Sequence, residues 1–342
     1  MMGYDVTIGI PVYKSADFVR RSLESALAQT YPSIEILVVD DAGGDGSLEI
    51  IQQIRCTHPR GNDIHLICHQ ENQGVSASRN QIIDHAKGCF LYFMDSDDVI
   101  AEKTIELLMS QVRSYDAEMV FGSYEKVELS GHKKLYQYPD VHFTHKDELA
   151  AFAYRKYAGI QASACNYLIK IDILRENHLR FIETDYWEDM VFTFDLVTYI
   201  SRAVMLSDIT YSYICRPHSL SHYQYRETIS KHEVWQNVRA VDYLKRTSTR
   251  LVDKVYFPNR CCNIVMTDFY IACNILKRRK AIAPYVEDWE IKSLMKHPAS
   301  FRQVCKFRQS HAKNTILFVL SKLPVFWCVR VIWCVGKLKK LI

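Results

Sequence analysis

The sequence contains no apolar run of the roughly 17–25 residues that a membrane-spanning helix needs. It also has no Cys-x-x-Cys pair and no regular spacing of Cys and His typical of a zinc site. Its 43 Lys and Arg nearly balance 39 Asp and Glu, so the net charge is only +4. These absences exclude a polytopic membrane protein, and they argue against nucleic acid as a partner because nucleic-acid-binding domains are usually more basic.

The chain also lacks both common glycine motifs for phosphate binding. There is no G-x-x-x-x-G-K-[ST] loop and no G-x-G-x-x-G fingerprint, and Gly43, Gly44 and Gly46 have a different spacing. Any phosphate group would therefore be held by a metal ion and cationic side chains instead of a glycine cradle.

Cysteine is plentiful but shows no disulfide framework. The 11 Cys include the adjacent pair Cys261 and Cys262, and several others lie in apolar runs, where Cys packs as a small hydrophobe. The first residues lack a basic stretch followed by an apolar one, which is the pattern of a secretory signal. These features predict a cytoplasmic protein.

Strand-like and helix-like segments alternate through the first 123 residues. Short apolar runs predict strands at residues 6–10, 34–39, 64–68, 90–94 and 119–123. Helical spacing predicts helices at residues 15–29, 47–55, 75–86 and 101–114, the first capped by Ser15. This alternation predicts an α/β fold with a Rossmann-like, mostly parallel sheet flanked by helices. Further helices are expected at residues 149–157, 169–176, 190–200 and 232–245, and the later ones form a helical carboxy-terminal extension.

Polar residues follow each of the first four predicted strands. They are residues 11–13, 40–41, 69–74 and 95–98. In open α/β sheets, ligands bind beyond the carboxyl ends of the strands. The four polar segments therefore predict a small-molecule site at one edge of the sheet.

An acidic cluster follows the fourth predicted strand. In an extended chain, side chains two residues apart point the same way, so Asp95 and Asp97 would repel each other unless a cation lay between them. Mg²⁺ and Mn²⁺ prefer such oxygen ligands and share them with phosphate. The alternative is an acidic loop that caps the helix starting near residue 101. The position beside Asp40 and Asp41 favours a metal site.

Several segments, in order along the chain, resemble the family 2 glycosyltransferases, which have the GT-A fold. They are residues 6–13 (VTIGIPVY), 22–31 (SLESALAQTY), 38–47 (VVDDAGGDGS), 71–80 (ENQGVSASRN), 93–98 (FMDSDD), 164–175 (ACNYLIKIDILR), 187–192 (WEDMVF) and 211–221 (YSYICRPHSLS). The resemblance covers residues 4–225 and is to enzymes of bacterial polysaccharide synthesis. It does not specify the donor sugar or the acceptor.

The resemblance implies which residues hold the donor. Pro11, Tyr13, Asp41 and Asn72 would hold the nucleotide, most often uridine. Arg79 would lie near the base or the diphosphate, although it could instead pair with a surface acid. The donor would therefore be a nucleotide sugar, with UDP as the expected carrier.

The resemblance also implies a metal site around the D-x-D motif. Asp95, Ser96 and Asp97 form that motif, and Asp97 would bind Mn²⁺ or Mg²⁺ directly. Arg216 would neutralise the diphosphate. His218 would complete the metal shell, or it is a solvated loop histidine.

The resemblance assigns the catalytic base to Asp189, and the alternative is an acid favoured by the dipole at a helix start. One base opposite the leaving group gives a single in-line displacement, which inverts the anomeric centre. The processive relatives carry Q-x-x-R-W, whereas residues 236–240 (QNVRA) lack the Trp, so transfer of a single sugar is expected. The alternatives are a nucleotidyltransferase and a non-catalytic nucleotide-sugar-binding module.

Residues 301–342 carry nine basic and no acidic residues among Trp, Phe and Leu. This composition predicts a helix lying on an anionic membrane, the alternatives being a buried helix or a dimer contact. The predicted domains are a catalytic domain at 1–225, a helical extension at 226–300 and a basic, membrane-associating tail at 301–342. Such a protein would be peripheral on the inner face of the cell membrane, with a saccharide or lipid-linked acceptor.

Overall fold

The computed structural model describes residues 3–155, 160–216 and 227–342. The chain divides into two compact units. The first contains residues 1–149, 160–183 and 192–219, and the second contains residues 150–159, 184–191 and 220–342. Residues 226–342, the predicted extension and tail, thus fall within the second unit.

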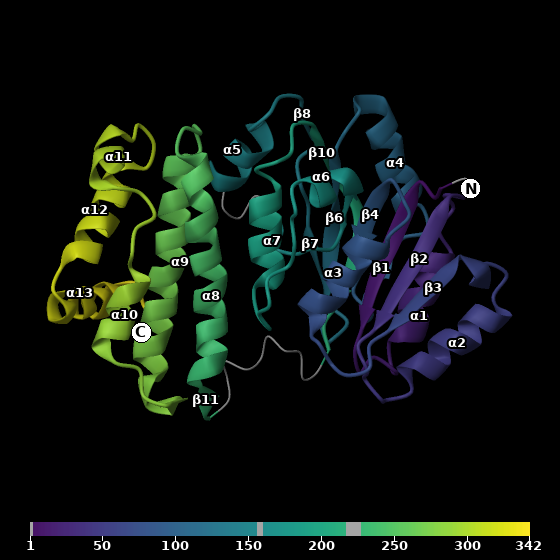
Figure 1. The fold of residues 1–342 in the computed structure, drawn as a ribbon, viewed down its shortest axis with the longest axis horizontal. Helices are drawn as coiled ribbons and strands as arrows, with labels where there is room; N and C mark the ends of the chain where they lie inside the picture. Colours follow the sequence, from purple (N-terminus) through teal and green to yellow (C-terminus); the bar gives the residue numbers. More distant parts are fainter. Residues whose placement is uncertain (1–2, 156–159, 217–226) are drawn as a thin grey trace. The chain divides into compact units, whose positions relative to one another are not determined.

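Four parallel strands form the first half of the sheet in the first unit (Figure 1). They are β1 (Val6–Val12), β2 (Ile34–Asp40), β3 (Ile64–Cys68) and β4 (Phe90–Phe93). Their order in the sheet is β3-β2-β1-β4. Every residue of β1 and β2 is buried, which explains why both strands are nearly continuous apolar runs instead of alternating ones.

The second half of the sheet adds antiparallel pairings. Its strands are β5 (Val99–Ile100), β6 (Met119–Val127), β7 (Lys133–Tyr136), β8 (Val141–Phe143), β9 (Tyr167–Lys170) and β10 (Ala203–Ile214). β9 runs antiparallel between β4 and β6, and β10 lies parallel to β6. The predicted α/β class, with a parallel sheet flanked by helices, is confirmed.

Helices cover the sheet where the apolar spacing predicts them. They are α1 (Val19–Leu27), α2 (Ser47–Thr57), α3 (Val75–His85), α4 (Thr104–Tyr115) and α6 (Ile171–Glu176). Two local predictions are wrong. Residues 169–170 belong to β9, and α1 begins at Val19 without a side-chain cap because the Ser15 hydroxyl bonds elsewhere.

A missing side chain on β1 lets α3 lie close to the sheet. A Cβ atom added to Gly9 would lie only 2.4 Å from Cγ2 of Ile82 on α3. Glycine is therefore needed for this close approach. α3 also carries Arg79, and the close approach of α3 to β1 places Arg79 at the carboxyl ends of the strands.

The second unit is helical. It comprises most of α5 (Glu148–Arg155), the start of α7 (Glu188–Leu196), α8 (Lys231–Thr247), α9 (Phe257–Arg278), α10 (Asp288–Leu294), α11 (Phe301–Lys306), α12 (His311–Lys322), α13 (Val325–Leu338) and the short strands β11 (Ile229–Ser230) and β12 (Ile282–Ala283). α13 packs on α9 and α10 and buries Cys328, Val329 and Ile332. Among the described helices, none has the length and apolar character needed to cross a membrane.

Candidate active site

The carboxyl ends of the four parallel strands meet at one edge of the sheet. The register pairs Val12 at the end of β1 with Asp40 at the end of β2, and Asp40 with Cys68 at the end of β3. β4 pairs in parallel with β1 and continues directly into the acidic residues 95–98. The structure therefore brings the predicted polar loops together at this edge.

Asp41 organises the loop that follows β3. Its Oδ1 accepts the Gln73 N–H at 2.8 Å and lies 2.7 Å from Nδ1 of His69. Its Oδ2 accepts from the Gly74 N–H at 2.8 Å and from Nδ2 of Asn72 at 3.2 Å. A carboxylate has about four acceptor positions, so the loop already fills those of Asp41. A direct bond from Asp41 to a nucleotide would require the release of one of these partners, whereas Asn72 itself is exposed.

Residues 95–98 form a turn, which corrects the predicted extended geometry of the D-x-D motif. The Asp98 N–H donates to the Asp95 carbonyl at 3.2 Å, the hydrogen bond that closes a β-turn. Asp95 and Asp97 consequently bond to different elements instead of pointing the same way along a strand.

Asp95 pairs with an arginine from α3. Its Oδ1 lies 3.0 Å from Nη2 of Arg79, whose side chain is only 6% exposed. The Arg79 guanidinium also lies over the ring of Phe181, 5.3 Å from its centroid. The structure therefore holds Arg79 at the strand ends, next to the predicted D-x-D motif and not at a surface acid.

Asp97 pairs with an arginine from the end of β10. Its Oδ2 lies 2.6 Å from Nε of Arg216, and the Arg216 guanidinium lies 5.4 Å from the ring centroid of Phe18. Arg21 on α1 adds a hydrogen bond of 3.1 Å to the Asp97 carbonyl. Two arginines from separate elements, Arg21 and Arg216, thus contact Asp97.

Asp98 has a structural role that sequence reasoning missed. It is buried, its Oδ2 accepts from the Tyr211 hydroxyl at 2.6 Å, and its Oδ1 accepts from the Ile214 N–H at 2.7 Å. The Tyr211 oxygen in turn accepts the Asp95 N–H at 3.2 Å. Tyr211 is the first residue of the family-like segment 211–221. That resemblance is the feature of the sequence that points to a role for Tyr211 at the site. Asp98 ties the acidic turn to β10.

The turn of residues 95–98 brings three carboxyl groups close together, and burial disfavours the ionised forms of Asp97 and Asp98. Burial raises the pKa of Asp97, and the neighbouring Asp95 raises it further, whereas Arg216 lowers it. Burial, followed by Asp95 and Asp97, raises the pKa of Asp98 well above its ordinary value. Groups with raised carboxyl pKa values favour a bound cation or a proton.

Two serines join the loops of β1 and β4. The Ser15 and Ser96 hydroxyls lie 2.7 Å apart and are both buried, so Ser96 positions the acidic turn. Ser22 adds a hydrogen bond of 3.1 Å to the Asp95 carbonyl. Pro11 is buried inside β1, whereas the Tyr13 ring is 42% exposed at the same edge. Tyr13 therefore offers a partly exposed ring in this loop, with Nζ of Lys14 5.2 Å from its centroid.

The carboxylate oxygens of Asp95 and Asp97 are ligands of the kind that a hard divalent ion prefers. Within residues 3–155, 160–216 and 227–342, no group of three or more His, Cys, Asp and Glu side chains is arranged to hold a metal, and His218 lies outside the described residues. Mg²⁺-type sites commonly use one or two carboxylates and complete their shell with water and substrate phosphate. Asp95 and Asp97, with side chains 34% and 18% exposed, fit that requirement.

Comparison with known proteins gives the family. Residues 7–175 match the family described as glycosyl transferase family 2. The chain belongs to this family. It is 37% identical over 120 residues to the glycosyltransferase GlyG of Streptococcus pneumoniae, covering 35% of this chain and 38% of GlyG. It is 36% identical over 121 residues to the E. coli UDP-Glc:alpha-D-GlcNAc-diphosphoundecaprenol beta-1,3-glucosyltransferase WfaP, covering 35% of this chain and 44% of WfaP.

A solved structure extends the likeness to nearly the whole family 2 chain. The crystal structure of S. aureus TarS 1–349 in complex with UDP-GlcNAc superposes with a TM-score of 0.56 at 17% identity, covering 93% of this chain and 90% of that one. This likeness confirms the GT-A fold. The family 2 chain spans less than half the length of GlyG and WfaP.

The predicted base of this family 2 chain lies in the second unit. Asp189 is in the first turn of α7, and its Oδ1 accepts the Met190 N–H at 2.6 Å. Trp187, two residues earlier, has a positive φ of 64°, which is unusual for a bulky residue. The predicted donor-site residues Asp95, Asp97, Arg79 and Arg216 all belong to the first unit.

Proposed function

We propose that this family 2 chain is an inverting, metal-dependent glycosyltransferase that moves one sugar from a UDP-sugar to an acceptor hydroxyl. The observation that carries this proposal is the pair of partly exposed carboxylates, Asp95 and Asp97, each matched to an arginine at the carboxyl edge of the sheet. UDP is the nucleotide named for the TarS complex and for WfaP, which supports a UDP donor. WfaP is also named for a diphosphoundecaprenol-linked acceptor, which supports a lipid-linked saccharide or a surface polysaccharide here.

In this proposal the first unit binds the donor. The exposed ring of Tyr13 and the amide of Asn72 contact the nucleotide, and Asp41 keeps the loop of Asn72 in place. Asp95 and Asp97 hold Mn²⁺ or Mg²⁺, which would supply Lewis-acid stabilisation of the departing diphosphate.

Arginine side chains also act on the diphosphate of the donor. Arg216 is 31% exposed, so it can turn from Asp97 toward a phosphate group, whereas the buried Arg79 stays with Asp95 and keeps that carboxylate in position. Bidentate guanidinium contacts suit phosphate oxygens well.

Asp189 takes the proton from the acceptor hydroxyl. The hydroxyl oxygen then forms the new glycosidic bond while the bond to the diphosphate breaks on the opposite face, which inverts the anomeric carbon. A positioned general base of this kind contributes about 10²–10⁴-fold to the rate.

Ligand-dependent thermal unfolding tests the donor assignment. UDP with Mn²⁺ is expected to raise the midpoint of unfolding by several degrees, since ligand at 100 times its Kd adds about 2.7 kcal/mol. EDTA should remove most of that rise, because the carboxylates then repel the diphosphate. GDP and CMP with Mn²⁺ are the matched ligands and should give smaller shifts. A shift confined to another nucleotide would overturn the UDP assignment, and no shift with any nucleotide would contradict the enzyme proposal.

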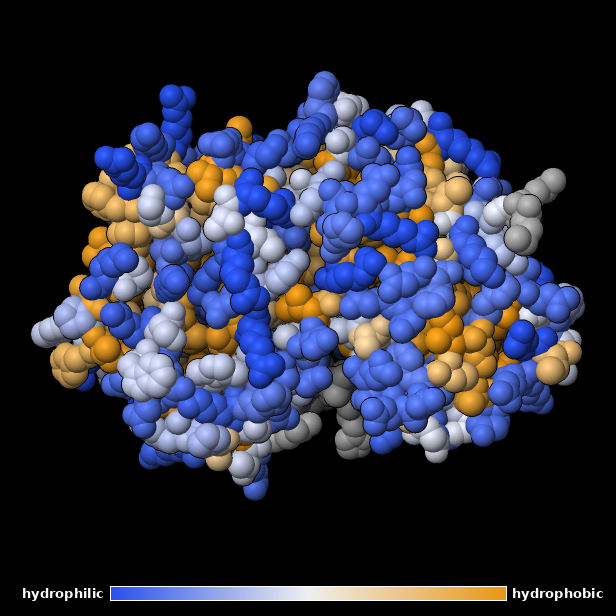
Figure 2. Space-filling view, viewed as in Figure 1, coloured by the Kyte–Doolittle hydropathy of each residue, from blue (hydrophilic) through white to orange (hydrophobic). Residues whose placement is uncertain are grey.

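The second unit has the surface that a peripheral membrane protein needs. All nine basic residues of 301–342 are exposed, and this segment contains no acid. Large apolar side chains are exposed among them, including Ile316 (67%), Phe326 (63%) and Trp327 (58%). Figure 2 shows this mixture of hydrophobic and hydrophilic surface over α11–α13. We propose that this surface binds anionic lipid on the inner face of the cell membrane.

Reversing three charges tests the membrane proposal. Changing Lys313, Lys322 and Arg330 to Glu is expected to weaken binding to phosphatidylserine-containing vesicles at least about 100-fold, since each basic side chain contributes about 1 kcal/mol. Sedimentation with vesicles measures the effect. Deleting residues 301–342 is a poorer test because it would uncover the face of α9 and α10 on which α13 packs.

The matched control reverses three exposed basic residues of the first unit: Arg55, Lys103 and Lys134. It has the same net charge as the test variant and should retain most of the binding. Equal losses in both variants would mean that overall charge decides the interaction, which would contradict a specific membrane surface on α11–α13.

A further inference from the structure

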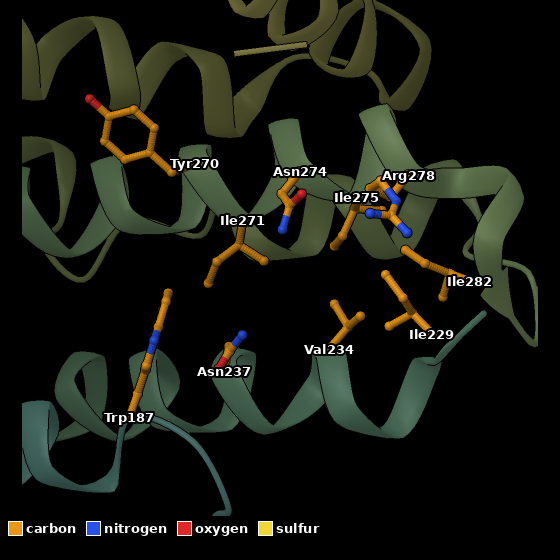
Figure 3. A pocket seen from close by; sticks show the side chains of 10 residues that line it. All are labelled: Trp187, Ile229, Val234, Asn237, Tyr270, Ile271, Asn274, Ile275, Arg278 and Ile282. Atoms are coloured by element: carbon orange, nitrogen blue, oxygen red, sulfur yellow. The ribbon is translucent and has the colours of Figure 1, made fainter. Parts of the chain in front are cut away.

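A cavity of about 200 Å3 lies between α8 and α9, entirely within the second unit (Figure 3). Its walls are mainly aliphatic, with Val234 from α8 and Ile271 and Ile275 from α9. A saccharide would place many hydroxyl groups against these walls, where they would find few hydrogen-bond partners, and that loss is costly. The first unit has a surface that suits a saccharide better, because its side chains are both aromatic and polar.

This surface is one face of the sheet at β7, β6 and the end of β10, which pair side by side (Figure 1). Paired residues of neighbouring strands project from the same face, and so do residues two apart in one strand. The register therefore gives two rows on this face: Tyr211, Tyr124 and Tyr136 in the first row, and Tyr213, Lys126 and Lys134 in the second. We call these six residues the tyrosine–lysine face.

Contacts between the side chains agree with this register. The rings of Tyr124 and Tyr136 stack with centroids 4.7 Å apart and an angle of 3° between their planes. Nζ of Lys126 lies 5.9 Å from the ring centroid of Tyr213, and Nζ of Lys134 lies 5.0 Å from that of Tyr136. All five side chains are partly or fully exposed, so a ligand can reach them.

The lysines of this face are available to an anion. Among the residues that the structure describes, neither Lys126 nor Lys134 forms an ion pair with an acidic side chain. The opposite face of the same strands differs, because Lys133 there lies 2.9 Å from Glu125. Positive charge is therefore neutralised on one face of the hairpin and left for a ligand on the other.

The tyrosine–lysine face begins at the turn of residues 95–98. The Tyr211 hydroxyl donates to Asp98 at 2.6 Å and accepts the Asp95 N–H at 3.2 Å. Burial, followed by the nearby Asp98, raises the pKa of Tyr213 to about 12. Neighbouring strands lie about 4.8 Å apart, so Lys134 is two strand spacings, roughly 10 Å, from Tyr213. The face thus leads outward from the proposed donor site over more than the width of one sugar ring.

We propose that the tyrosine–lysine face is a subsite for the saccharide of the acceptor, and that Lys126 and Lys134 select a saccharide that carries a carboxylate or a phosphate group. Tyrosine offers a sugar both an apolar ring and a hydroxyl group. A lysine ammonium is a point charge on a flexible stem, so it can bind either anion. This assignment rests on the proposed function and extends it from a saccharide acceptor to an anionic one.

Pairs of charged and neutral oligosaccharides test the proposal on the full-length protein with UDP and Mn²⁺ present. The hyaluronan tetrasaccharide, which carries carboxylates, is expected to bind about 5–30-fold more tightly than neutral chitotetraose in a calorimetric titration. Mannopentaose phosphate and mannopentaose make the same comparison for a phosphate group. Preference for the charged member of either pair supports the proposal and identifies the anion, whereas equal binding within both pairs would overturn it.

A double variant tests the two lysines. Lys126→Gln combined with Lys134→Gln should weaken binding of the preferred charged oligosaccharide about 5–30-fold, since each exposed charge pair contributes at most about 5-fold. Binding of the neutral counterpart should not change. Lys133→Gln is the matched control, because it removes the neighbouring cation of β7 that pairs with Glu125 on the opposite face. Equal losses in both variants would mean that overall charge decides binding, which contradicts a subsite.

A second pair of variants tests the aromatic part. Tyr136→Ala should weaken the charged and the neutral oligosaccharides alike, about 5-fold or more, because a contacting ring and hydroxyl are lost. Leu135→Ala removes a side chain that is 55% exposed on the opposite face, and it should leave binding unchanged. If Tyr136→Ala does not fold, the lysine variants still decide the question.

The donor titration separates the subsite from the proposed function. A thermal shift with UDP and Mn²⁺, without any preference for charged oligosaccharides, would reject the subsite alone. The loss of both the shift and the preference would reject the proposed function as well.

Discussion

Replacing Asp189 with Asn is expected to lower turnover about 10²–10⁴-fold while UDP binding in the presence of Mn²⁺ persists. Asparagine has nearly the same size and retains an oxygen that can accept the Met190 N–H, which Asp189 Oδ1 now accepts at 2.6 Å. It cannot take up the proton of an acceptor hydroxyl. Single-turnover transfer assays measure the loss, and calorimetric titration with UDP measures donor binding.

Glu183→Gln is the matched control for this variant. It removes an exposed carboxylate six residues earlier, and it should leave both turnover and UDP binding close to those of the wild type. Turnover of Asp189→Asn close to wild type would place the base elsewhere, and a parallel loss of UDP binding would indicate a structural role. The variant also separates the alternatives, because a nucleotidyltransferase does not need this base and a binding module has no turnover to lose.

Replacing Asp97 with Ala should lower kcat/KM about 10²–10³-fold and abolish the enhancement of UDP binding by Mn²⁺. Loss of one carboxylate from a two-carboxylate site removes metal affinity, and the metal contributes several kcal/mol to leaving-group stabilisation. The raised pKa of Asp97 shows that burial and Asp95 disfavour an isolated carboxylate there, which a divalent ion would compensate. Titration of UDP at increasing Mn²⁺ concentration measures the effect.

Asp84→Asn is the control for a broken ion pair. Asp84 Oδ1 lies 2.6 Å from Nη2 of Arg180, the same separation as in the Asp97–Arg216 pair, but the two side chains are 49% and 37% exposed near the end of α3. Exposed pairs contribute little, so this variant should behave as wild type. An Mn²⁺ enhancement that survives in Asp97→Ala would contradict the proposed metal site.

Much of the first unit could be predicted because its signals are local. The apolar runs that predict β1, β2 and β4 are fully or largely buried, β3 is partly buried, and helical spacing predicts α2 and α3 to within two residues at each end. The sequence predicts a helix at residues 169–176, but residues 169–170 end β9 and lead directly into α6. Short apolar segments do not distinguish a strand from a helix, and only pairing with β4 and β6 decides the matter.

The partners of the site residues could not be predicted from spacing. Ser15 fits a helix cap by sequence, but its hydroxyl lies 2.7 Å from that of Ser96, a residue 81 positions away. The sequence assigns no role to Asp98, whereas in the structure its two carboxylate oxygens accept hydrogen bonds from the Tyr211 hydroxyl and the Ile214 N–H. These contacts join segments that are distant in sequence, and periodicity carries no information about them.

The amino-acid sequence by itself determined the α/β order of the first unit, the acidic motif after β4 and the absence of a glycine phosphate loop, since propensity, burial pattern and motif spacing are properties of neighbouring residues. Only the tertiary structure decided which arginine meets which carboxylate, that residues 95–98 turn instead of running extended, and that α8 and α9 leave a cavity beside Trp187. Those outcomes depend on the packing of elements far apart in the chain, where the fit of side-chain volumes and the pairing of buried charges select one arrangement among many that the local pattern allows.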